Sequence, residues 1–258
     1  MSSVLRDPAV AGIFYPERKE PLGELLDHLV TDAREKRKAI AVVVPHGSLF
    51  SSGAVAAAVY GSLRPFDTAV ILGPNHSRLG ERLSVAANGE WVTPLGRVPV
   101  DRDLALLLLK AVPDLKRDSK AHPYEHAAEL QLPFLQRLWK IRSFVPLAFS
   151  GMDAETAQQA GLGVARAIQK SGRDALLIAT AHLTRYEPRE RAERLDRQLI
   201  ERITALDGEG LMRQVAESGG SMCGAPAVAA AISAAKELGA SRVSLVKYEA
   251  GYAGLLIQ

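Results

Sequence analysis

The chain has 258 residues, of which 47% are hydrophobic, so it can bury a large core and disorder is excluded as its main state. Its 32 basic and 29 acidic residues leave a formal charge of +3, well short of the concentrated basic surface that nucleic-acid binding requires. No apolar run approaches the roughly 20 residues that span a bilayer, and no secretory signal is recognisable near Arg6 and Asp7. We therefore expect a cytoplasmic protein that binds neither nucleic acid nor membrane.

Predicted helices and strands alternate along the chain. A first helix is marked by apolar residues at helical spacing, namely Leu22, Leu25, Leu26, Leu29 and Ala33. Three strong strands, rich in β-branched and other apolar residues, are predicted at 39–44, 68–72 and 175–180. Weaker strands are predicted at 83–87, 144–148, 243–248 and 252–257, a hairpin or ordered loop at 89–101, and further helices at 157–168 and 227–238.

This alternation predicts an α/β fold in which helices flank a mainly parallel central sheet. No internal repeat or low-complexity linker divides the sequence. We therefore expect a single layered domain over residues 1–258.

Three histidines share one position relative to the strong strands. His46 and His182 each lie two residues past a predicted strand, and His76 lies four past another. Ligands of open α/β sheets bind outside the carboxyl ends of the strands. Because those ends meet at one edge of a parallel sheet, the spacing predicts that the three imidazoles share a crevice.

Cys223 is the only cysteine, so no intramolecular disulfide can form. It precedes Pro226 and an alanine-rich helical pattern, which predicts a sulfur near a helix N-terminus, where the thiolate is favoured. The thiolate is the form that binds metals and attacks electrophiles, although a small buried apolar residue is an alternative role. Two imidazoles and a thiolate would suit iron, copper or zinc, with a position left open for water or substrate.

A pair of carboxylates flanks another histidine. Glu125 and Glu129 are one helical turn apart with His126 beside the first, so one carboxylate could orient an imidazole at the site. An ordinary exposed acidic helix start is the alternative. His122 and His126 have the spacing of a zinc-binding helix, but Pro123 between them argues against a continuous helix there.

Several sequence blocks, taken in order, resemble the MEMO family, which includes protein B of the AmmeMemoRadiSam system. The blocks are Arg6 to Pro16, Pro45-His46 with Ser52-Gly53, Gly73-Pro74-Asn75-His76, Trp91 with Thr93-Pro94-Leu95-Gly96 and Asp101, Glu125-His126 with Glu129, Gln131 to Gln136, Cys223-Gly224 with Pro226, and Gly251-Tyr252-Ala253-Gly254. The likeness covers nearly the whole chain. It implies a fold similar to that of class III extradiol dioxygenases.

The resemblance also implies site residues. His46, His76 and Cys223 fall on the family's metal-ligand positions, with iron or copper the expected metal. Glu125, His126 and Tyr186 are expected to orient ligands or to contact the substrate. Radical-SAM and AMMECR1-like proteins are the implied partners.

The segment after the third strong strand departs from the family pattern Ser-Ser-Asp-Leu-Ser-His-Tyr. Residues 180–186 read Thr-Ala-His-Leu-Thr-Arg-Tyr, so His182 replaces the aspartate and Arg185 replaces the histidine. Arginine stays protonated and cannot serve as a general base, but it could hold an anionic substrate. The pattern after His46 and the loop at Glu249 and Ala250 also differ, so we expect an altered pocket without typical extradiol ring cleavage.

Three functional hypotheses follow. The first is a protein that holds one transition-metal ion and carries out redox or O₂-linked chemistry on a small molecule, with His182, Arg185 and Cys223 in catalytic roles. The second is a non-catalytic binding or scaffold protein of the AmmeMemoRadiSam system. The third is an enzyme in which Cys223 is the nucleophile and His46 or His182 is its base.

Overall fold

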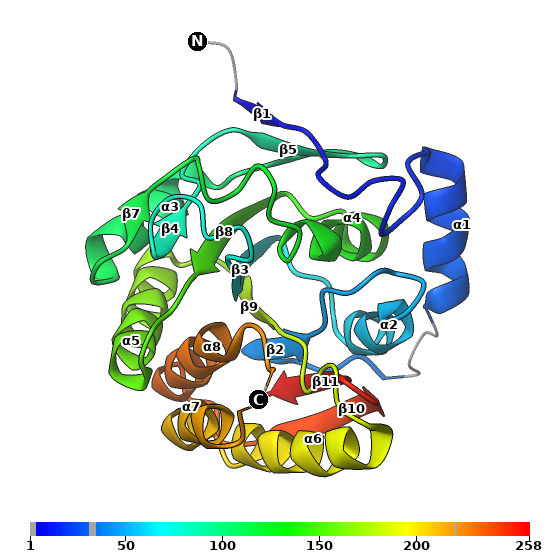
Figure 1. The fold of residues 1–258 in the computed structure, drawn as a ribbon. Helices are drawn as coiled ribbons and strands as arrows, with labels where there is room; N and C mark the ends of the chain where they lie inside the picture. Colours follow the sequence, from blue (N-terminus) through cyan, green and yellow to red (C-terminus); the bar gives the residue numbers. More distant parts are fainter. Residues whose placement is uncertain (1–3, 31–34, 220) are drawn as a thin grey trace.

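A mixed sheet of eight strands forms the centre of the computed structural model, which describes residues 4–30, 35–219 and 221–258 (Figure 1). Four neighbouring strands run parallel, in the order β2 (Ala41–Val44), β9 (Ala175–Thr180), β3 (Thr68–Pro74) and β8 (Ser143–Phe149). Their continuous apolar runs suit strands that are covered on both faces. The predicted α/β fold with a parallel central sheet is therefore confirmed.

Antiparallel pairing extends the sheet on both sides of this parallel centre. Beyond β2 lie β11 (Tyr252–Ile257) and then β10 (Val243–Glu249), both paired antiparallel. Beyond β8 lies β4 (Leu83–Val85), antiparallel to β8, and then the short edge strand β7 (Lys116–Arg117).

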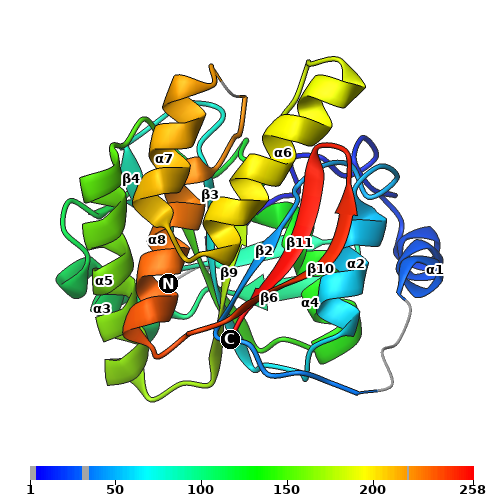
Figure 2. The ribbon, with the colours of Figure 1, turned by 90° about the horizontal axis from the view of Figure 1, so that it is seen from below.

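Helices cover both faces of the sheet (Figure 2). One face carries α1 (Lys19–Leu29), α2 (Gly53–Gly61) and α4 (Leu132–Trp139), the last preceded by the 3₁₀ turn η1 (Glu129–Gln131). The other face carries α3 (Arg102–Ala111), α5 (Ala154–Ser171) and α8 (Ala225–Glu237), with α7 (Gly208–Glu217) packed on α8 and α6 (Arg189–Thr204) beside α7 and β10. None of these helices, within the described residues, is long and apolar enough to cross a membrane.

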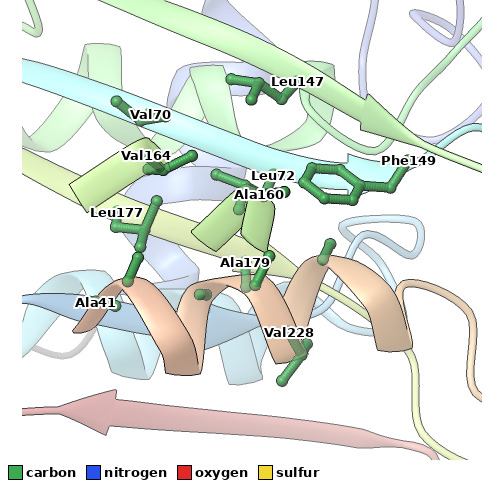
Figure 3. Packing of buried hydrophobic residues seen from close by; sticks show 14 of the residues in the cluster. Ala41, Val70, Leu72, Leu147, Phe149, Ala160, Val164, Leu177, Ala179 and Val228 are labelled. Atoms are coloured by element: carbon green, nitrogen blue, oxygen red, sulfur yellow. The ribbon is translucent and has the colours of Figure 1, made fainter. Parts of the chain in front are cut away.

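Strand residues alternate between two apolar cores. Ala41 and Val43 of β2 belong to the core on the side of α5 and α8, while Val42 and Val44 belong to the core on the side of α1 and α2. This is the period-two alternation of a strand, applied to a sheet that is buried on both sides. Figure 3 shows the core on the side of α5 and α8, where side chains of α5 pack against β3 and β9.

A smaller sheet lies beside the large one. It contains β1 (Leu5–Arg6), β5 (Glu90–Thr93) and β6 (Gly96–Pro99), so the hairpin expected within residues 89–101 is confirmed. Gly96 closes its turn with φ +125°, a conformation that glycine adopts without strain.

The sequence pattern placed some helices wrongly. The first helix ends at Leu29, and Ala33, which was expected to continue it, lies outside the described residues. The pattern did not reveal α2, because its sequence GAVAAAVYG has no polar face that would show a helical period. Residues 125–128 are turn and loop, so the helical turn expected from Glu125 to Glu129 does not form.

Close packing between α5 and α8 holds the helix that Cys223 precedes. A Cβ atom added to Gly161 of α5 would lie 2.2 Å from the carbonyl oxygen of Ala230 in α8. Gly23 of α1 offers a matched control, because an added Cβ there would meet nothing within 4 Å.

We predict that Gly161→Ala and Gly23→Ala change stability in opposite directions. Gly161→Ala must push α8 away, which should lower the free energy of unfolding by about 1–3 kcal/mol. Gly23→Ala should raise it by about 0.5–1 kcal/mol, since alanine favours the helix. Urea denaturation of both variants measures the difference, and equal effects would contradict this packing.

Candidate metal centre

The site lies at the carboxyl ends of three adjacent parallel strands. β9 pairs with β2 on one side and with β3 on the other. His46 follows β2 by two residues, His182 follows β9 by two, and His76 follows β3 by two because that strand extends to Pro74. The sheet therefore brings together three imidazoles that are far apart in sequence, as their spacing predicted.

His46 is completely buried and is bonded at both ring nitrogens. Its Nδ1 lies 2.8 Å from Thr180 Oγ1, and its Nε2 lies 3.2 Å from Cys223 Sγ. Gln131 Nε2 donates to the same Thr180 hydroxyl at 3.3 Å, and Tyr60 donates to Gln131 Oε1 at 2.8 Å. This chain of hydrogen bonds fixes the ring so that Nε2 faces the sulfur.

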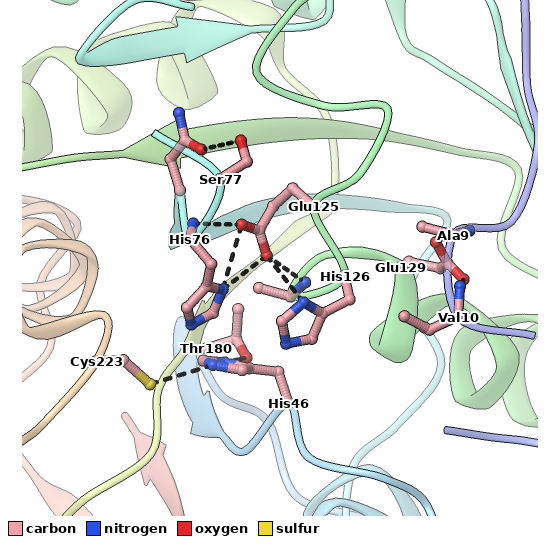
Figure 4. Close-up of polar contacts among 12 residues, drawn as sticks. Ala9, Val10, His46, His76, Ser77, Glu125, His126, Glu129, Thr180 and Cys223 are labelled. Atoms are coloured by element: carbon pink, nitrogen blue, oxygen red, sulfur yellow. Dashed lines mark hydrogen bonds and ion pairs between the residues drawn. The ribbon is translucent and has the colours of Figure 1, made fainter. Parts of the chain in front are cut away.

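Glu125 holds His76. The carboxylate accepts from the backbone N–H of His76 at 2.6 Å, and its other oxygen lies 3.0 Å from His76 Nδ1 (Figure 4). It also accepts from the backbone N–H of Ala127 at 2.8 Å. With Nδ1–H donated to Glu125, the Nε2 atom of His76 remains as the ligand atom, in the way that carboxylates orient metal-binding histidines.

Cys223 stands just before α8, as the sequence predicted. Gly224 is the N-cap residue with φ +80°, and a Cβ there would lie 2.5 Å from the carbonyl oxygen of Thr180, so only glycine lets this turn approach β9. An isolated antiparallel bridge joins Cys223 to His182. Ligand atoms of Cys223, His46 and His76 all lie within 4.8 Å of one another.

Two further imidazoles complete a four-histidine cluster. The ring of His126 stacks on that of His76 at 4.7 Å between centroids, and the ring of His182 lies 4.1 Å from that of His46. Phe14 packs edge-on against His126 at 5.2 Å. The cluster is therefore enclosed by the N-terminal segment as well as by the sheet.

The surroundings divide the histidines into two charge states. Burial lowers the pKa of His46 well below its usual value, and the nearby Arg185 charge acts in the same direction. Burial and then the Arg185 charge lower the pKa of His182 to about 3. Burial also acts to lower the pKa of His76, but hydrogen bonds to Cys223 and Glu125 outweigh it and raise the pKa to about 9.

A second set of donor groups overlaps the first. His76, Glu125 and His126 also bring one ligand atom each within 4.8 Å of the others. The hydrogen bonds of Glu125 to His76 and Ala127 already occupy its oxygens, however. The set of His46, His76 and Cys223 is therefore the better candidate, with Glu125 orienting one of its members.

Buried carboxylates hold the loops around the site. Glu129 accepts from the Arg6 guanidinium, from the Tyr15 hydroxyl and from the backbone N–H groups of Ala9 and Val10. Asp196 on α6 is fully buried and accepts from the backbone N–H of Thr184 at 2.8 Å, from that of Gly251 at 2.9 Å and from the Tyr248 hydroxyl at 2.8 Å. The first carboxylate fixes the N-terminal segment, and the second fixes the loop that carries Arg185.

Arg185 points toward the histidine cluster. Its NH1 atom lies 3.2 Å from His182 Nδ1, while Glu187 pairs with Arg191 rather than with Arg185. Tyr186 is 90% exposed and lies under the Arg185 guanidinium at 5.1 Å. The structure thus brings His182 and Arg185 to the same site as the candidate ligands and leaves Tyr186 at its rim.

Sequence reasoning did not assign roles to Thr180, Gln131 or Asp196. Thr180 and Gln131 are polar residues with no exposed surface, and Asp196 is an acidic residue on the apolar side of α6. Each of these polar residues stands where the helical or strand pattern calls for an apolar one, which the sequence does show. The sequence does not show which group each residue contacts.

The fold and the site together define an α/β protein whose histidine and cysteine side chains converge at the carboxyl edge of a sheet. The family model described as "Memo-like protein" matches residues 6–254. Similar proteins include MEMO1 family proteins from Methanosarcina mazei, Methanopyrus kandleri and Aquifex aeolicus, with 39%, 38% and 37% identity. These alignments cover 94–95% of this chain and 91% of each relative.

This chain therefore belongs to the Memo-like family, which confirms the resemblance found in its motifs. Among solved structures, an uncharacterized protein from Escherichia coli K12 has a similar fold, with a TM-score of 0.64. That match covers 86% of this chain and 100% of the other, at 14% identity, so it speaks for the fold alone.

We predict that the stability of chelator-treated protein falls on both sides of about pH 6.5, the ordinary histidine pKa. The raised pKa of His76, about 9, gives stability that is complete below 6.5 and is lost as the pH rises through 9. The lowered pKa values of His46 and His182 give stability that is present above 6.5 and is lost as the pH falls.

Urea titrations between pH 5 and pH 9.5 test this profile. Glu125→Gln should flatten the alkaline side, because it removes a charge that raises the pKa of His76. An unchanged alkaline slope in Glu125→Gln would contradict the assigned contact.

Proposed function

We propose that this protein holds one transition-metal ion, iron or copper, and uses it for redox or O₂-linked chemistry on a small molecule. The ligands are His46 Nε2, His76 Nε2 and Cys223 Sγ. The observation that carries the proposal is the approach of these three ligand atoms to within 4.8 Å of one another at the carboxyl edge of the sheet.

The donor set fits such an ion. Imidazole and thiolate together suit iron, copper and zinc, and three protein ligands leave a coordination position for water or substrate. A bound iron or copper ion would supply one-electron chemistry, which none of the side chains provides.

The chain's own residues prepare the ligands. Glu125 directs the Nε2 lone pair of His76 inward by accepting a hydrogen bond from Nδ1–H, and the Thr180 hydroxyl accepts one from His46 Nδ1–H in the same way. Burial keeps His46 neutral, which is the form that can coordinate. Hydrogen bonds to Cys223 and Glu125 raise the pKa of His76 to about 9. His76 must therefore lose its Nε2 proton before Nε2 can bind a metal ion.

A Cys–His nucleophile pair is a second candidate, because Cys223 Sγ lies 3.2 Å from His46 Nε2. The lowered pKa of His46, caused first by burial, makes this ring a weak base. The rate of alkylation of Cys223 by iodoacetamide separates the two functions. A nucleophile reacts rapidly whether or not metal is added, whereas a metal ligand is protected by iron or copper.

We predict that protein purified without affinity-tag metal or chelator binds about one equivalent of iron or copper. His46→Ala, His76→Ala and Cys223→Ala should each weaken binding by more than roughly 100-fold, since removing a ligand costs more than removing an orienting group. His28→Ala, on the exposed side of α1, is the matched control and should bind normally. Elemental analysis and metal titration give the result, and full metal content in all three ligand variants would disprove the site.

The affinity for metal should rise with pH. Because the pKa of His76 is about 9, ligation below that value must displace its proton, which gives about a tenfold gain in affinity per pH unit. Metal titrations at pH 6, 7 and 8 measure this gain, and an affinity independent of pH would contradict the ligand assignment.

A further inference from the structure

Arg185 places a positive charge beside the candidate metal ligands without an acidic partner. Its NH1 atom lies 3.2 Å from His182 Nδ1, and the ring of His182 lies 4.1 Å from that of His46. Across residues 4–30, 35–219 and 221–258, no carboxylate pairs with Arg185, and the acidic residue closest in sequence, Glu187, pairs with Arg191. The guanidinium charge is therefore left for a ligand.

His182 fixes this guanidinium rather than competing with it. A guanidinium can only donate hydrogen bonds, so His182 Nδ1 must accept and the ring proton lies on Nε2.

The backbone on either side of Arg185 is held in place. Asp196 accepts from the N–H of Thr184 at 2.8 Å. The Ser221 hydroxyl accepts from the N–H of Arg185 and donates to its carbonyl oxygen at 2.7 Å. Because the backbone is ordered before a ligand arrives, binding costs less conformational entropy.

A hollow of about 410 Å³ lies at the loop that carries Arg185. Arg185, Tyr186 and Tyr252 are among its lining residues, together with Glu187 and Arg189. The ring of Tyr252 packs edge-on against that of His182 at 5.2 Å, so the hollow borders the histidine cluster. Its volume lies in the lower part of the range for small-ligand pockets, about 300–1,000 Å³.

We propose that Arg185 binds the carboxylate group of a small organic acid whose body occupies this hollow against Tyr186 and Tyr252. A guanidinium offers two parallel N–H donors that match a carboxylate. A phosphate dianion suits the hollow less well, because Arg189, the other cation that lines it, is paired with Glu193, and Glu187 is paired with Arg191. Only the description of this acid as the substrate rests on the proposed function; the binding itself does not.

The test uses chelator-treated protein, so that metal cannot hold the ligand. Acetate, pyruvate and benzoate are titrated against wild type and followed by NMR, with benzamide as the neutral match for benzoate and inorganic phosphate as the competing anion. Arg185→Gln should weaken the carboxylate that binds wild type best by at least about tenfold, which removing a charge-assisted hydrogen bond can produce. Arg194→Gln, an exposed arginine on α6, makes the same change in charge and should leave affinity unchanged.

Three results would overturn the proposal. They are failure of all three carboxylates to bind wild type, equal binding to Arg185→Gln, and tighter binding of phosphate or benzamide than of any carboxylate. Circular dichroism of Arg185→Gln, with Arg185→Lys as a charge-retaining variant, shows that a loss of affinity is not a loss of folding. If carboxylate binds through Arg185 but the protein takes up no iron or copper, the proposed function fails and the Arg185 site stands. If the protein takes up iron or copper but binds no carboxylate, the Arg185 proposal fails and the proposed function stands.

Discussion

The parallel pairing of β9 with both β2 and β3 is the constraint on which the histidine cluster depends. It places the carboxyl ends of three strands side by side, so short loops suffice to bring His46, His76 and His182 together. Cys223 reaches the same point through the bridge to His182 and the tight turn at Gly224. A shift of any of these strands along its neighbours would separate the candidate ligands.

Three buried carboxylates convert this arrangement of strands into a fixed site. Glu125, Glu129 and Asp196 each accept backbone N–H groups from loops that lack regular structure. A buried charge is tolerated only where such donors satisfy it, and removing one partner leaves the rest unsatisfied at a cost of several kcal/mol. Hydrogen bonds to these carboxylates therefore hold the loops, which have no helical or strand hydrogen bonds of their own at these positions.

The site combines groups with contrasting charge behaviour. Burial favours neutral His46 and His182 by lowering their pKa values, while hydrogen bonds to Cys223 and Glu125 raise the pKa of His76. Arg185 adds a guanidinium group beside His182. The proposed metal ligands and the proposed carboxylate-binding residue are therefore different groups, so the two proposals can be tested separately.

The sequence alone determined the main strands of the large sheet and placed His46, His76 and His182 just after three of them, because apolar runs are a local pattern. It did not reveal the two-residue strands β1 and β7, which are too short to show such a pattern. It also determined that Cys223 precedes a helix, since Pro226 and the alanines after it act locally. Only the tertiary structure decided that Glu125 hydrogen-bonds His76 at 3.0 Å while the adjacent His126 lies 3.6 Å from the same oxygen, and that Arg185 turns toward His182. These contacts join residues on separate loops, and their choice of partner depends on burial and charge that exist only once the chain has folded.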